Sequence, residues 1–202
     1  LGGLVGSEMC IRDSMSGARR QIFIVFAAFM MVERFGFDAA DIALLFLANH
    51  TINTWLAPRI GRYIAHWGER RALTLEYVGL IGIFTAYAFV DVAWLAALLY
   101  VADHVLFAMA IAIRSYFQKI ADPADIAASS GVAFTINHIA AVIIPAAFGL
   151  IWLTSPAAVF LCGTAMAVIS LLLARLVPNQ PAPGRETVLA PVPAVEGAFP
   201  PG

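Results

Sequence analysis

Six long apolar runs follow one another along the chain, separated by short polar connections. A helix needs roughly 20 mostly apolar residues to cross a hydrocarbon core about 30 Å thick. The pattern therefore predicts an all-α integral membrane protein with six transmembrane helices, at residues 19–35, 41–59, 73–90, 93–113, 126–153 and 156–177. The first run is short in its apolar part, residues 22–32, as expected of a helix that has lost its first turns.

The two ends of the chain do not continue this pattern. Residues 4–14 resemble an in-frame translation of a sequencing adapter, so we interpret residues 1–14 as an artefactual leader, and Met15 need not be the native start. Seven of the 11 prolines lie between Pro178 and Pro201. Such a segment cannot bury a core, so we expect residues 178–202 to form a disordered cytoplasmic tail behind a membrane domain at 15–177.

The composition supports a membrane protein and excludes other classes. Hydrophobic residues make up 61% of the chain and charged residues 12%, against about 45–50% and about 25% in soluble domains. A formal net charge of −1 gives no basic field for nucleic acid. With only two cysteines and no metal-ligand signature, we expect no cofactor. We expect the lipid bilayer to surround the chain.

Charge placement predicts the orientation. The connections after the second, fourth and sixth runs are rich in basic residues, namely Arg59, Arg62, Arg70, Arg71, Arg114, Lys119 and Arg175. The opposite connections carry acidic residues and one basic residue, Arg34. By the positive-inside rule, the 61–71 loop and the C-terminus face the cytoplasm of a cell (inner) membrane.

The 61–71 loop resembles the loop signature of the major facilitator superfamily, G-x-x-x-D-[RK]-x-G-[RK]-[RK]. Gly61 and Gly68 match its two glycines, and basic residues accompany them at Arg62, Arg70 and Arg71. The chain departs from the signature at three positions, with Ala65 for the aspartate, His66 for the next basic residue and Glu69 for the first of the final pair. Such degenerate copies are typical of the second half of the family. A plain positive-inside loop is the alternative interpretation.

The resemblance covers residues 15–177 and implies one half of a larger transporter. That half would be the C-terminal six helices of a twelve-helix secondary active transporter, built as two inverted three-helix repeats and working by alternating access. The implied partners are a small-molecule substrate, with or without a coupled proton, and a missing N-terminal six-helix half. We therefore expect the fragment alone not to transport.

Polar clusters inside two apolar runs mark the candidate site. Asn49, His50 and Asn53 lie in the second run, and Asn137 and His138 repeat the Asn-His pair in the fifth. Each pair is followed by a proline, at positions 58 and 145. At about 1.5 Å per residue, His50, His138 and Asp103 fall near the bilayer midplane, where secondary transporters place their substrate and ion sites. These side chains predict a substrate or proton cavity.

The roles of the individual residues stay open at this point. Asp103 is either a proton-coupling carboxylate, a contact to a cationic group, or an interhelical hydrogen-bond partner. The histidines either contact substrate and relay protons or hydrogen-bond with the asparagines between helices. Arg19 and Arg20 are cytoplasmic anchors if Met15 is the native start, and an anion-binding pair facing the cavity if the chain was cut. Glu76 is expected to pair with a loop arginine such as Arg62 or Arg70.

Two other classes of protein are alternatives to a transporter. One is an intramembrane enzyme with His50, Asp103 and His138 as metal ligands or acid–base groups, although no H-E-x-x-H signature is present. The other is a complete six-helix membrane protein with a structural role. The gene sequence upstream of Met15 would distinguish the latter from a transporter half.

Overall fold

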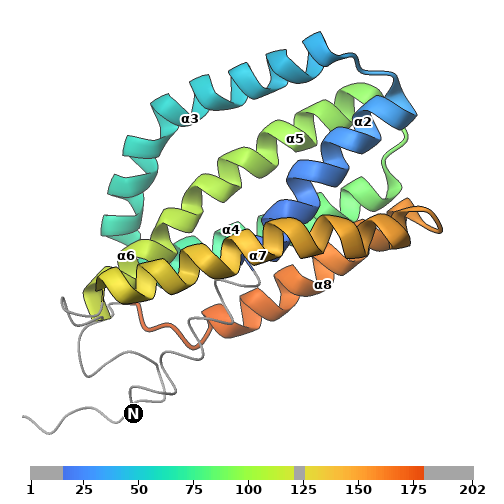
Figure 1. Ribbon diagram of the computed structural model, residues 1–202. Coiled ribbons are helices and arrows are strands. Elements are labelled where there is room, and N and C mark those ends of the chain that lie inside the picture. Colours follow the sequence, from blue (N-terminus) through green and yellow to red (C-terminus); the bar gives the residue numbers. More distant parts are fainter. Residues whose placement is uncertain (1–15, 121–125, 180–202) are drawn as a thin grey trace, which may run out of the picture.

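The computed structural model describes residues 16–120 and 126–179, and all the helical residues fall into six continuous segments (Figure 1). The predicted leader and nearly all of the predicted tail lie outside these described residues. The six segments are residues 16–35, α3 (Ala39–Trp67), α4 (Glu69–Phe89), residues 93–120, α7 (Ile126–Trp152) and α8 (Pro156–Ala174).

Two of the six segments are not uniform α-helices. Helix 16–35 contains a π-helical stretch, η1 (Phe23–Ala27), before α2 (Ala28–Phe35). Segment 93–120 consists of α5 (Ala93–Phe107), the 3-10 turn η2 (Ala108–Ala110) and α6 (Ile111–Ile120). π-Helical stretches are rare and frequently occur at functional sites.

The membrane assignment follows from length and composition. Four described helices are long and apolar enough to cross a membrane, at residues 69–89, 93–119, 130–152 and 156–174. The chain is therefore a multi-pass membrane protein. Helix 16–35 and α3 are long enough but are not among these apolar helices. Helix 16–35 carries the charges of Arg19 and Arg20, and α3 carries the polar Asn-His cluster. The prediction of six helices is thus confirmed, and four of them qualify as spans on composition alone.

The first two segments are joined by well-defined caps. Helix 16–35 ends at Gly36, whose φ of 71° is left-handed. α3 starts with a reciprocal capping box, in which the Asp41 amide donates to Asp38 Oδ1 at 2.8 Å and the Asp38 amide donates to Asp41 Oδ2 at 3.1 Å. This polar turn lies at the connection expected from the sequence.

The prediction of a long 61–71 loop was wrong. α3 continues through Pro58 and Gly61 to Trp67, and only Gly68 separates it from α4. A single glycine suffices because its φ of 86° turns the chain sharply, which a residue with a Cβ rarely does. The fourth segment likewise extends past its predicted end at residue 113 to Ile120.

The core lies where α4, α8 and helix 16–35 meet. α4 and α8 form the most extensive helix pair, and an aromatic cluster fills the space beside them, with Phe23 at 5.2 Å from Tyr87 and Tyr87 at 5.1 Å from Phe160 between ring centroids. α3 runs along one side of the bundle and α7 along the other, with α5 and α2 between them (Figure 1). Both flanking helices leave large apolar side chains exposed, including Trp55 and Leu150.

Candidate functional site

A buried ion pair joins three segments in the interior. Arg19 Nη2 lies 3.3 Å from Glu76 Oε1, and Arg19 Nη1 donates to Ser170 Oγ at 3.4 Å. The guanidinium also sits 5.0 Å from the centroid of the Tyr77 ring. The side chains of Arg19 and Glu76 are 1% and 0% exposed. Buried charges of this kind persist only when paired, so the pair ties helix 16–35 to α4 and α8.

This pairing corrects the predicted partner of Glu76, and it fits neither of the two roles predicted for Arg19. Glu76 pairs with Arg19, not with Arg62 or Arg70, because its position seven residues into α4 places it inside the bundle. Arg62 is exposed at the far end of α3. Arg19 is therefore neither a surface anchor nor free to bind an anion.

Asp103 lies in the same interior region, on α5. Its side chain is buried, and the charges that act on it are those of Arg19, Glu76 and Arg20. The phenols of Tyr87 and Tyr100 are also within electrostatic range of its carboxylate. The predicted midplane carboxylate is thus part of a charged cluster rather than an isolated group.

Arg20 and His104 form the accessible edge of this cluster. Arg20 is exposed, with its guanidinium 4.8 Å from the centroid of the Phe107 ring. His104 Nδ1 lies 3.0 Å from the Tyr100 carbonyl oxygen, and its ring is 4.6 Å from the Tyr100 ring. The charges of Arg20 and His50 both act on His104. His50, itself exposed, therefore lies on α3 within electrostatic range of His104 on α5.

The asparagines of α3 face the same interior. Asn49 is 2% exposed, and neither its amide nitrogen nor its oxygen has a hydrogen-bond partner among the described residues. The Asn53 oxygen is also unpartnered there. The ring of Phe46, one turn before His50, lies 6.0 Å from that of Tyr100 and anchors this face of α3 against α5. Buried amides normally have partners, so Asn49 stands out as a buried polar side chain whose hydrogen-bonding groups are unsatisfied among the described residues.

The second Asn-His cluster sits on α7, with both side chains exposed. His138 Nδ1 lies 2.9 Å from the Phe134 carbonyl oxygen, and the two rings are 3.9 Å apart. Asn137 lies against Gly17, because a Cβ built at Gly17 would collide with the Asn137 side-chain oxygen. α7 thus approaches helix 16–35 just before Arg19. The participation of Asn137 and His138 in the site stays a prediction.

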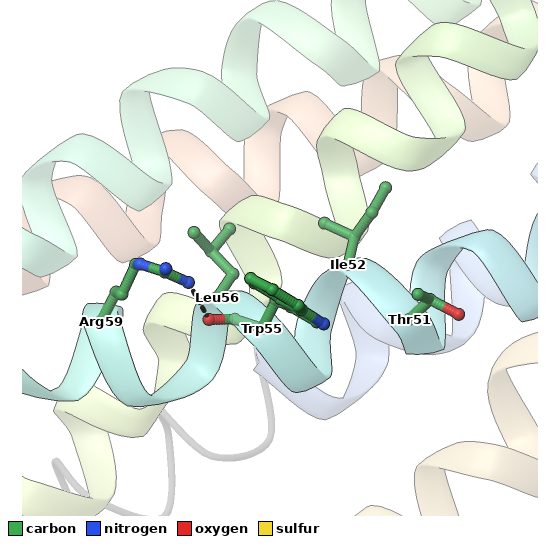
Figure 2. Close-up of a pocket in the computed structure, with 5 residues that line it drawn as sticks. All are labelled: Thr51, Ile52, Trp55, Leu56 and Arg59. Carbon is green, nitrogen blue, oxygen red and sulfur yellow. Dashed lines mark hydrogen bonds between the residues drawn. The ribbon is translucent and has the colours of Figure 1, made fainter.

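Figure 2 shows a groove on α3 that is distinct from this cluster. It is lined by Thr51, Ile52, Trp55, Leu56 and Arg59, and Arg59 Nη1 donates to the Trp55 carbonyl oxygen at 2.7 Å. His50 and Ile52 are two positions apart and therefore point to opposite sides of the helix. The groove is mostly apolar and contains none of the candidate site residues.

The segment that resembles the family loop holds a third buried acid, Glu69, whose contacts were not predicted from the sequence. Glu69, directly after Gly68, accepts a hydrogen bond from Ser115 Oγ at 2.9 Å and lies 2.5 Å from Lys119 Nζ. These contacts tie the start of α4 to α6. The arginines predicted to hold this loop differ in exposure, with Arg62 and Arg71 exposed and Arg70 half-buried.

A metal centre is not supported by the part of the chain that the structure describes. No three His, Cys, Asp or Glu side chains come together there as metal ligands would. His50, Asp103 and His138 in particular do not form such a group. The described residues therefore do not support the interpretation of the chain as a metalloenzyme that uses His50, Asp103 and His138 as ligands.

Comparison with known proteins gives one match. Neither the curated proteins nor the solved structures contain a significant match. The sequence profile described as Major Facilitator Superfamily matches residues 14–145. Since that match covers more than half of the 202 residues, and the fold is a helical membrane bundle, the chain belongs to the Major Facilitator Superfamily, a family of transporters and not of enzymes.

Proposed function

We propose that this chain forms part of a secondary active transporter that carries a small solute by alternating access. The observation that carries the proposal is the cluster of Arg19, Arg20, Glu76, Asp103 and His104 inside a membrane bundle. Charged groups at membrane depth are costly and typically mark solute or ion pathways. His50 and Asn49 of α3 complete the polar face of this site.

The depth of these residues supports a solute site. His50 lies 11 residues after Ala39 at the start of α3, and Asp103 lies 10 residues after Ala93 at the start of α5. At about 1.5 Å per residue, each is roughly 15 Å from the outer end of its helix. That depth is near the middle of a hydrocarbon core about 30 Å thick. Asp103, His50 and His104 are the groups that would carry a coupled proton.

We also propose that the chain corresponds to the C-terminal half of the transporter, arranged as two inverted repeats. α3 and α7 would be equivalent helices, each with an Asn-His pair and an internal proline, Pro58 or Pro145. The C-terminus and the α3–α4 junction would face the cytoplasm. The gene upstream of Met15 tests this proposal: six further spans support it, whereas a ribosome-binding site directly before Met15 supports a stand-alone six-helix protein.

Uptake by reconstituted vesicles tests the division into halves. We expect vesicles containing residues 15–202 alone to accumulate no solute above empty vesicles, because half of the walls around the site would be absent. Vesicles containing the chain together with the six-helix half encoded upstream are expected to transport. Uptake by residues 15–202 alone would contradict the proposal.

A further inference from the structure

We infer that the transported solute is a small organic anion, and that Arg20, His104 and His50 bind its charged group. The inference rests on the proposed transport function and names its substrate class. It depends on a difference in accessibility: Arg20 and His50 are exposed and His104 is half-buried, whereas the acidic residues Glu76 and Asp103 are buried.

The two neighbouring arginines have different environments. Arg19 is buried and already bound to Glu76 and Ser170. Arg20 is exposed, and its described contact is with the face of the Phe107 ring, with no hydrogen bond to another described residue. A guanidinium stacked on an aromatic ring keeps its N–H groups at its edge, in a fork that fits a carboxylate. Arg20 is therefore the member of the pair that can bind an anion.

His104 is positioned to assist Arg20. A carbonyl oxygen only accepts hydrogen bonds, so the contact with the Tyr100 carbonyl requires that His104 Nδ1 carry a hydrogen. The Nε2 atom is then the one left for a solute, and it donates when the ring is protonated. The charges of Arg20 and His50 act on this ring. An anion beside this ring would offset the repulsion that each of those two charges exerts on the protonated ring.

The acidic side chains do not offer a comparable site for a cation. Glu76 and Asp103 are both buried, at 0% and 5% exposure. The exposed acidic residues among those described lie near the helix ends, at Glu33, Asp38, Asp41 and Asp91. Asp103 is flanked by Arg19 and Arg20, with Glu76, Tyr87 and Tyr100 as its other ionisable neighbours. Its negative charge therefore opposes the binding of an anion beside Arg20.

Half-buried aromatic rings surround this basic edge. Phe107 lies under Arg20, and Phe46 of α3 approaches the Tyr100 ring of α5. Such rings favour a flat apolar body attached to the anionic group. Benzoate is a suitable probe for this reason, and benzamide and benzylamine are its neutral and cationic counterparts of similar size.

Equilibrium dialysis of radiolabelled benzoate against the detergent-solubilised 202-residue chain tests the inference. Empty micelles serve as the blank. We expect saturable binding that unlabelled benzoate displaces and that equal concentrations of benzamide or benzylamine do not. Arg20→Gln should raise the apparent Kd at least tenfold, which corresponds to about 1.4 kcal/mol. Arg20→Lys should restore part of the affinity, and Asp103→Asn should tighten binding by removing a negative charge near the bound anion.

Arg62→Gln is the matched control. It removes the same charge from an exposed position near the C-terminal end of α3, away from His50, and should leave the Kd unchanged. Equal effects of Arg20→Gln and Arg62→Gln, or no saturable binding of benzoate, would overturn the inference. Binding of benzylamine that Asp103→Asn abolishes would assign the site to cations, and equal displacement by benzamide would assign it to neutral solutes. Either of those two results would refute the inference that the substrate is an anion. The proposed transport function would then still be tested separately, by the uptake experiment. Thermal unfolding of each variant separates lost binding from lost folding.

Discussion

Arg19 and Arg20 are adjacent in sequence, yet their side chains have opposite roles in the structure. Arg19 is buried between Glu76 and Ser170, whereas Arg20 is exposed beside Phe107. Successive residues on a helix differ by about 100° in direction, so one arginine faces the bundle and the other its edge. The first holds the bundle together, and the second is the arginine that we propose to bind the solute.

The buried ion pair predicts a large effect on stability. Glu76→Gln or Arg19→Gln leaves one charge buried without its partner, and such changes typically cost about 3–5 kcal/mol. We expect either variant to lower the thermal unfolding midpoint of the detergent-solubilised protein clearly. Arg34→Gln is the control, because Arg34 pairs with Asp91 at an exposed site, where pairs contribute about 0–1 kcal/mol. Equal midpoints for Glu76→Gln and Arg34→Gln would refute the structural role of the pair.

Among the secondary-structure elements, α3 shows both the strength and the limit of sequence reasoning. Its apolar residues predict a helix, and Asn49, His50 and Asn53 stand out as polar exceptions within it. The predicted end at Arg59 was wrong, because basic residues and a glycine suggested a loop where the helix continues to Trp67. Charged residues are compatible with helix, and Gly61 within a helix costs only about 1 kcal/mol. Only the backbone of Gly68 reveals where the turn lies.

The two glycines of the family-like segment, Gly61 and Gly68, are therefore predicted to differ in how much an alanine substitution changes the stability of the protein. Gly68 has a φ of 86°, and a Cβ there would meet the Asn179 carbonyl oxygen. Gly61 lies within α3 with nothing within 4 Å of such a Cβ. Gly68→Ala should destabilise the protein by about 1 kcal/mol or more, and Gly61→Ala should be neutral or stabilising by up to about 1 kcal/mol. Thermal unfolding of the two variants measures the difference, and a larger loss for Gly61→Ala would contradict the described turn.

At the scale of the whole molecule, hydropathy predicts the six helices but not how their polar residues meet. Asp103 and the α3 cluster were identifiable because polar residues interrupt apolar runs. The partner of Glu76 was not, since Arg19 lies 57 positions away and only packing brings them together. His104 was not among the predicted site residues, because it follows Asp103 directly and its side chain points about 100° away from that of Asp103. The inverted repeat that would relate α3 to α7 stays a prediction.

The central claim is that His50 and its neighbours form a water-reachable site inside a membrane transporter. Its most direct test is cysteine labelling in membrane vesicles that contain the chain together with the six-helix half encoded upstream, after Cys10 and Cys162 of the chain are replaced by Ser. Cysteine at position 50 should react with a membrane-impermeant maleimide from either side of the membrane, because alternating access exposes the site to each in turn. Cysteine at position 168, on the exposed apolar face of α8, should stay unreactive. Equal labelling of the two positions, or no labelling at position 50, would contradict the account.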